Sequence, residues 1–85
     1  MKAIIPIFHH DTTKSLYLQL YEYLKNSITK GEITEGEKLP SLRSLSKELS
    51  LSLTTITSAY QQLEVEGYIQ SKPQSGYYVR HIPFL

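Results

Sequence analysis

The sequence predicts a mainly α-helical domain with a small β-hairpin, arranged as a winged helix-turn-helix of three helices plus a β-wing. Two observations predict this fold. Residues 41–66 contain two short helical patterns separated by a link of only a few residues. Residues 68–80 then contain two β-rich runs separated by Pro73 and Gly76, which is the pattern of a hairpin.

The length and composition set limits on what the chain can be. Eighty-five residues form one small domain, with a compact core and modest stability. The absence of cysteine excludes disulfides and thiolate metal sites. No stretch approaches the roughly 20 apolar residues that a transmembrane helix needs, and Pro6 breaks the short apolar run at the start. We therefore expect a soluble, cytoplasmic protein without a membrane partner.

The first predicted helix begins at Ser15, a suitable N-cap. Apolar residues then recur every four positions, and Gly31 ends the helix in a left-handed conformation. The apolar stripe consists of Leu16, Leu20, Leu24 and Ile28. Residues 1–14 are expected to form an N-terminal extended arm, residues 15–80 the winged helix-turn-helix, and residues 81–85 the start of a linker to a further domain.

The second and third helices are predicted to start at serine caps. Pro40 disfavours helix at the residue before it, so the second helix starts after Pro40 with Ser41 as its cap. Ser52 caps the third helix, and Gly67 closes it. The predicted buried positions are Leu42, Leu45 and Leu49 in the second helix, and Ile56, Ala59, Tyr60 and Leu63 in the third. A short strand is also possible at Lys38 and Leu39.

The outward face of the third helix is rich in hydroxyl groups, which suggests contact with duplex DNA. Such side chains meet phosphates or base edges, and a threonine methyl can contact a thymine methyl. The residues that fall off the buried stripe are Thr54, Thr55, Thr57, Ser58 and Gln61. Arg43, near the start of the second helix, is placed to bind a phosphate or a guanine. Taken singly, each of these residues is also explained as a cap or as ordinary solvated surface.

The charge distribution gives this interpretation limited support. The net charge is +1, which is low for a nucleic-acid binder, although residues 38–85 hold five Lys or Arg against three Glu. A winged helix that makes protein–protein contacts is therefore the alternative interpretation.

Catalytic and metal-binding patterns are lacking. His9, His10 and Asp11 are adjacent on an expected polar loop, without the spacing that converges ligands on one ion, so a solvated loop is the better interpretation. No nucleophile triad, P-loop or glycine-rich phosphate motif occurs, and nothing in the sequence indicates an enzyme.

From Leu16 to Arg80 the sequence resembles the winged-helix DNA-binding domain of GntR-family bacterial transcription regulators. The segments that carry this resemblance are residues 31–33, 36–45, 55–56, 63–69 and 75–79, in the family's order and spacing. Residues 17–21 and 59–63 look most like the MocR branch. Proteins of that branch fuse this domain to an aminotransferase-like domain that binds pyridoxal phosphate, so this cofactor is expected only outside the present chain, which itself holds none.

The resemblance implies a set of DNA-contacting residues. The arginine of the family's Pro-Ser-x-Arg motif matches Arg43 and follows Ser41. The start of the recognition helix (52–66), which lies in the major groove, matches Ser52, Leu53, Thr54, Thr55, Thr57 and Ser58. The wing tip (72–76), which enters or flanks the minor groove, matches Lys72, Gln74, Ser75 and Gly76.

This sequence departs from the family pattern at two of those positions. Relatives usually have a basic residue where this chain has Leu53, and many have arginine at the position of Thr57. We therefore expect modest affinity for DNA, with Leu53 contacting thymine methyls. We also expect the full regulator to act as a homodimer on two half-sites.

Overall fold

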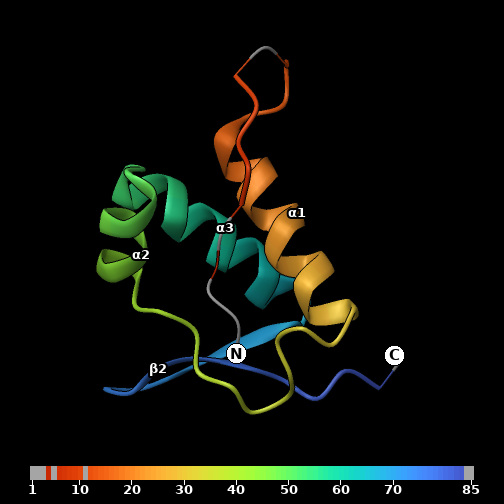
Figure 1. Cartoon of the computed structure of the whole chain (residues 1–85). Coiled ribbons are helices and arrows are strands. Elements are labelled where there is room, and N and C mark those ends of the chain that lie inside the picture. Colours follow the sequence, from red (N-terminus) through yellow and green to blue (C-terminus); the bar gives the residue numbers. More distant parts are fainter. Residues whose placement is uncertain (1–3, 5, 11, 84–85) are drawn as a thin grey trace.

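The computed structural model describes residues 4, 6–10 and 12–83. Helices α1 (Leu16–Thr29), α2 (Leu42–Leu49) and α3 (Leu53–Val65) precede strands β1 (Ile69–Lys72) and β2 (Gly76–Val79). Figure 1 shows α3 between α1 and α2, with the hairpin across one end of the helical layer. The predicted winged helix-turn-helix is confirmed.

The helix boundaries follow the predicted caps. The side chains of Ser15, Ser41 and Ser52 each accept a hydrogen bond from the backbone amide three residues later. Gly31 and Gly67 follow the ends of α1 and α3 with positive φ, as predicted. The link between α2 and α3 is tight because Ser50 adopts the left-handed conformation, with φ of 55°.

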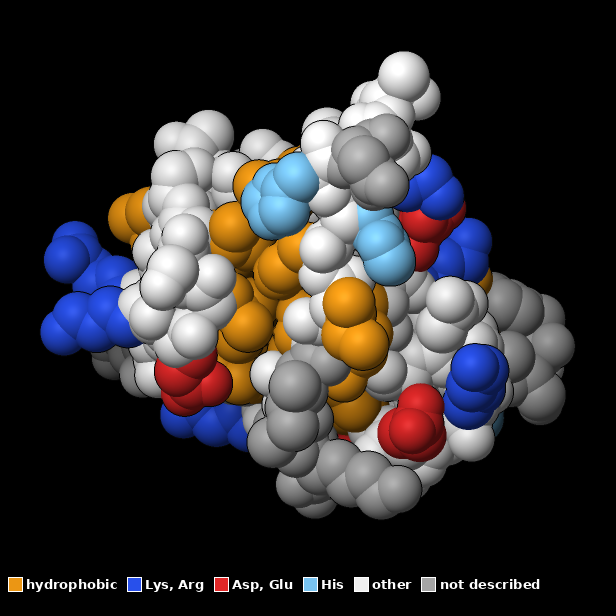
Figure 2. All heavy atoms as spheres, turned by 45° about the horizontal axis from the view of Figure 1, so that its top comes forward, with side chains coloured by type: hydrophobic (Ala, Val, Ile, Leu, Met, Phe, Trp, Pro, Cys, Tyr) orange, Lys and Arg blue, Asp and Glu red, His pale blue; other side chains and the backbone are white. Residues whose placement is uncertain are grey.

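The core is formed by all three helices, both strands and the segment between α1 and α2. Its fully buried members are Leu20, Leu24, Leu45, Ile56, Ala59, Tyr60, Leu63 and Ile69. Ile4, from the N-terminal segment, and Ile82, after β2, are also buried. Figure 2 shows a face on which hydrophobic side chains fill a hollow while Lys and Arg side chains lie at its margins.

Tyr60 holds α3 to the two elements that flank it. Its hydroxyl donates a hydrogen bond of 2.8 Å to the carbonyl oxygen of Pro40, just before α2. Its ring packs edge-on against Tyr77 of β2, with 5.0 Å between ring centroids. Burial raises the pKa of the Tyr60 hydroxyl. The orientation of α3 is thus fixed relative to both α2 and the wing.

The wing contains more than the hairpin. The antiparallel β1–β2 pair is flanked by residues 36–39, where Lys38 forms an isolated bridge with Tyr78. The amide of Leu39 donates to the carbonyl of Tyr77, at 2.9 Å. The short strand expected at Lys38 and Leu39 is therefore a single bridge. Gly76, expected in the turn, is the first residue of β2.

Parts of three predictions lie outside the described residues. These are residues 1–3, 5 and 11 of the predicted arm and its polar loop, and residues 84–85 of the predicted linker.

Candidate nucleic-acid interface

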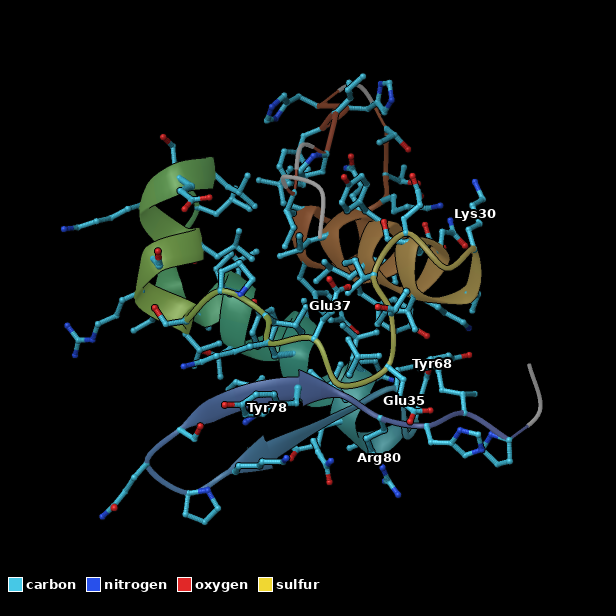
Figure 3. All side chains as sticks on the ribbon, turned by 60° about the horizontal axis from the view of Figure 1, so that its bottom comes forward. Lys30, Glu35, Glu37, Tyr68, Tyr78 and Arg80 are labelled. Atoms are coloured by element: carbon cyan, nitrogen blue, oxygen red, sulfur yellow. The ribbon has the colours of Figure 1, made fainter. Side chains whose placement is uncertain are left out.

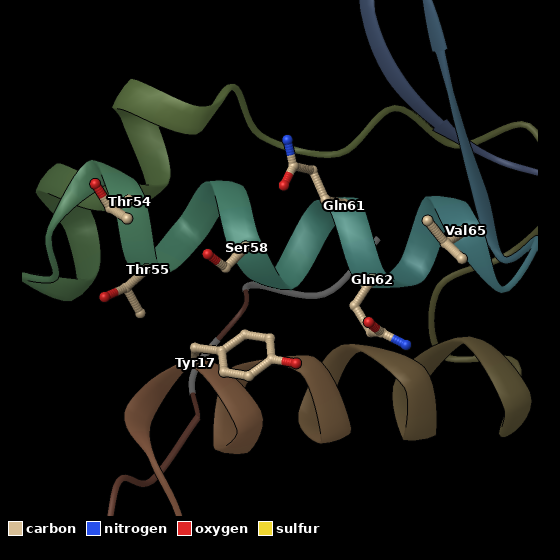
Figure 4. Close-up of a pocket in the computed structure, with 7 residues that line it drawn as sticks. All are labelled: Tyr17, Thr54, Thr55, Ser58, Gln61, Gln62 and Val65. Carbon is tan, nitrogen blue, oxygen red and sulfur yellow. The ribbon is translucent and has the colours of Figure 1, made fainter.

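The outward face of α3 forms one wall of an open groove of about 470 Å³. Thr54 and Gln61 are exposed on this face, and Val65 is 82% exposed further along the helix. Tyr17 of α1 forms the opposite wall, as Figure 4 shows. A row of mainly polar side chains is therefore accessible along α3, as an interface with DNA bases requires.

The other hydroxyl residues of α3 are half-buried, because they lie on the flanks of the helix beside α1 or α2. Thr57 donates its hydroxyl to the carbonyl of Leu53, at 2.8 Å. The Thr55 hydroxyl lies 2.8 Å from that of Ser52, which already caps the helix. Ser58 is half-buried in the groove across from Tyr17. Of the five residues expected to face outward, only Thr54 and Gln61 do so fully.

Arg43 lies at a second groove, between α2 and the start of α3. This groove, of about 530 Å³, is also lined by Lys47 and by Leu53, which is 42% exposed. Ser41 precedes it, and its hydroxyl accepts a hydrogen bond from the Ser44 amide, at 3.1 Å. Two cationic side chains and an accessible apolar one thus lie together beside the first turn of α3.

The predicted wing tip is exposed at three of its four candidate residues. Lys72 places its ammonium group 4.6 Å from the centre of the Tyr78 ring, and Ser75 shares a hydrogen bond with the Tyr78 hydroxyl. Gln74 occupies the left-handed region, with φ of 61°. Gly76, with φ of 137°, is half-buried.

The carboxylates at the C-terminal end of α3, on Glu64 and on the C-cap residue Glu66, form hydrogen bonds within the domain. Glu66 accepts hydrogen bonds from Tyr21 and from Gln62, the latter at 2.7 Å, and Lys25 lies 3.9 Å away. The bond from Tyr21 lowers the pKa of the Glu66 carboxyl. Burial, followed by the same bond, raises the pKa of the Tyr21 hydroxyl.

Glu64 is held in a similar way. It accepts hydrogen bonds from the backbone amide and the hydroxyl of Ser71, at 3.1 and 3.0 Å. Glu64 and the C-cap residue Glu66 therefore attach the end of α3 to neighbouring elements, and the half of α3 that begins at Leu53 contains no carboxylate.

The family of this chain is shown by a match to a protein-family model. The family model described as bacterial regulatory proteins, gntR family, matches residues 16–79. The chain belongs to the gntR family. A solved structure at 26% identity, the N-terminal domain of AraR in complex with mutant ORR3, matches with a TM-score of 0.74 and covers 81% of this chain and 99% of that one.

Individual relatives agree with this assignment. The chain is 48% identical over 75 residues to the uncharacterized HTH-type transcriptional regulator YdeL of Bacillus subtilis, covering 88% of this chain and 16% of the relative. It is 31% identical over 77 residues to the probable rhizopine catabolism regulatory protein MocR of Rhizobium meliloti, covering 91% of this chain and 16% of that protein. The chain thus spans about one sixth of the length of these relatives.

A solved gntR-family structure confirms the fold. YtrA from Sulfolobus acidocaldarius, a GntR-family transcription factor, superposes with a TM-score of 0.85 at 32% identity. The match covers 96% of this chain and 85% of that one. Among the described residues of the present domain, no helix has the length and apolar character needed to cross a membrane.

Lys47 and Tyr17 are among the groove-lining residues that were not singled out from the sequence. Lys47 lies four positions after Arg43, so helical spacing alone places both on one side of α2. Tyr17 comes from α1, and only the packing of α1 beside α3 brings it to the recognition helix.

Proposed function

We propose that this gntR-family domain places α3 in the major groove of duplex DNA and the wing, residues 72–76, at the minor groove. The observation that carries the proposal is the distribution of polar groups on α3. Thr54 is exposed on the helix half without carboxylates and Gln61 is exposed just beyond it, whereas Glu64 and Glu66 are bonded elsewhere. Phosphates repel carboxylates, so this half of α3 is the one suited to approach DNA.

Each candidate residue has a separate role in the proposal. Thr54 and Gln61 reach base edges, and Ser58 lies between them at the groove that Tyr17 borders. Leu53, accessible beside Arg43 and Lys47, contacts thymine methyl groups. Thr55 and Thr57 position the first turn of α3, since their hydroxyls already bond within it.

Arg43 supplies the main electrostatic contact of the proposal. It is exposed, and it lies beside the start of α3, where amide groups also favour phosphate. Arg43→Ala should therefore weaken binding and lower the slope of log K against log salt by about one, if the contact is to a phosphate. Fluorescence anisotropy with a labelled duplex, titrated across a salt series, measures both quantities.

The matched control for this variant is Lys30→Ala, which removes one exposed charge at the end of α1. It should leave affinity and salt slope close to those of the unaltered chain. Equal behaviour of the Arg43 and Lys30 variants would contradict the role assigned to Arg43. No binding to any duplex at about 50 mM salt would instead favour the protein-contact alternative, which the exposed Leu53 and Val65 side chains support.

The intact regulator is proposed to be a cytoplasmic homodimer of the MocR-like type. The similarity to MocR and the much greater length of the relatives support this. A single small module contacts few base pairs, and a dimer doubles the contact on two half-sites. In this proposal pyridoxal phosphate belongs to an aminotransferase-like domain outside residues 1–85.

A further inference from the structure

The outer face of the wing brings together side chains from three segments of the chain. Register places Lys72 opposite Gly76 and Gln70 opposite Tyr78, while Lys38 pairs with Tyr78 from the other side. Paired residues of antiparallel strands share a face, and alternate residues of one strand return to it. These five residues therefore project from a single face.

The opposite face of the wing packs on the domain. Tyr77 meets the ring of the buried Tyr60, Ile69 and Val79 are buried, and Ser71 bonds to Glu64 of α3. The four residues of the inner face are Ile69, Ser71, Tyr77 and Val79. The outer face is consequently the side that remains available to a partner.

The two lysines of the outer face approach the same end of the hairpin. The Lys72 ammonium lies 4.6 Å from the centre of the Tyr78 ring. The Lys38 side chain crosses β2 at Gly76, where its Cε lies 3.0 Å from the position that a Cβ would occupy. A glycine at this position therefore leaves the space through which Lys38 reaches the hairpin. Figure 3 shows Tyr78 on β2, with Arg80 further along the chain.

The charge of this face is unbalanced. Lys38 and Lys72 are exposed, and the ion pairs found within the described part of the chain involve neither of them. The five residues of the outer face include no carboxylate. Because the whole chain has a net charge of only +1, two ammonium groups on one face of the wing form a local excess of positive charge.

We propose that the outer wing face, with Lys38, Lys72 and Tyr78, binds the sugar-phosphate backbone of the duplex next to the wing tip. Lys38 is then a phosphate contact supplied from outside the hairpin, and it joins the wing to the segment that leads into α2. Ammonium groups bind phosphate as point charges, so this contact adds affinity without reading sequence. The proposal rests on the proposed function of the domain.

Salt-dependent binding of the 85-residue chain tests this proposal. Anisotropy titrations would use the duplex chosen for Arg43 and a second duplex of scrambled sequence. Lys38→Ala should weaken binding to both roughly three- to tenfold and lower the salt slope by about one. Lys38→Ala combined with Lys72→Ala should lower the slope by about two, whereas Lys38→Arg should retain it. Lys30→Ala is the control for loss of a remote charge.

The outcomes separate this proposal from the function on which it rests. If Arg43→Ala lowers the salt slope but Lys38→Ala behaves like Lys30→Ala, the outer wing face is not a phosphate contact and the proposal is overturned alone. If the unaltered chain binds neither duplex, both the proposed function and this proposal are overturned. Urea unfolding of each variant shows whether a loss of binding reflects a loss of folding.

Discussion

The two halves of α3 use their polar side chains in different ways. In the half that begins at Leu53, hydroxyls bond within the helix or face solvent, and Thr54 is exposed. In the half that ends at Val65, Glu64 accepts hydrogen bonds from Ser71 of β1, and the C-cap residue Glu66 accepts one from Tyr21 of α1. One half therefore attaches the helix to the domain, which leaves the other half free for a partner.

This division also explains how a nearly neutral chain presents a surface suited to DNA. The acidic groups lie at the attached end of α3. There Glu64 contacts β1, and the C-cap residue Glu66 contacts α1. Arg43 and Lys47 lie beside the free half. Local charge, rather than net charge, therefore decides which part of the surface can approach phosphate.

Replacement of Tyr60 should have the largest effect, because it removes the buried ring that joins α3 to the wing and to Pro40. Tyr60→Ala should lower the free energy of unfolding by about 4 kcal/mol, close to the total stability of a domain this small. Tyr60→Phe keeps the ring but leaves the Pro40 carbonyl without this donor, and should cost about 1 kcal/mol. Urea denaturation followed by circular dichroism measures both values.

The neighbouring Gln61 provides the matched control, since it is exposed to solvent on the same helix turn. Gln61→Ala should change stability by less than about 0.5 kcal/mol while weakening DNA binding. A Gln61 variant as unstable as Tyr60→Ala would show that the outward face of α3 is not free.

Loss of the Glu66 carboxylate should have a smaller effect, visible as a change in pH dependence. The hydrogen bond from Tyr21 lowers the folded-state pKa of Glu66, so its stabilisation is present above the unfolded-state pKa of about 4.3 and is lost as pH falls through the folded-state value. Glu66→Gln should therefore reduce the loss of stability on acidification. At neutral pH we expect a cost below about 1 kcal/mol, because the group is partly exposed.

Urea midpoints measured from neutral pH down to about pH 3 provide the test of this effect. Glu32→Gln, which alters the net charge equally at an exposed position outside this network, is the control. If the urea midpoints of the two variants fall equally as the pH is lowered, Glu66 has no special role in attaching the end of α3.

The sequence predicted the elements well because their signals are local. Each signal depends on neighbours within a few positions. The signals are the serine caps at Ser15, Ser41 and Ser52, the apolar residue at every fourth position of α1, and the turn residues near Pro73. The buried stripe of α3 was predicted for the same reason, since helical spacing alone fixes it.

The remaining features depend on contacts between distant segments, which periodicity does not contain. Tyr21 and Glu66 are 45 positions apart, and Lys38 meets Gly76 only because residues 36–39 lie along β2. Within α3, the pattern separated inward from outward positions but did not show that Thr55 and Thr57 would direct their hydroxyls into the helix. The DNA-contacting roles of the candidate residues stay predictions.

The most direct test of the central claim is a titration of the ¹⁵N-labelled chain with duplex DNA, followed by amide chemical shifts. We predict that the largest shifts occur at Thr54 and Ser58 in the free half of α3, at Arg43, and at residues 72–76, with small shifts near Glu66. Shifts concentrated around Glu66 and the end of α1, with none at Thr54 or Arg43, would contradict the account.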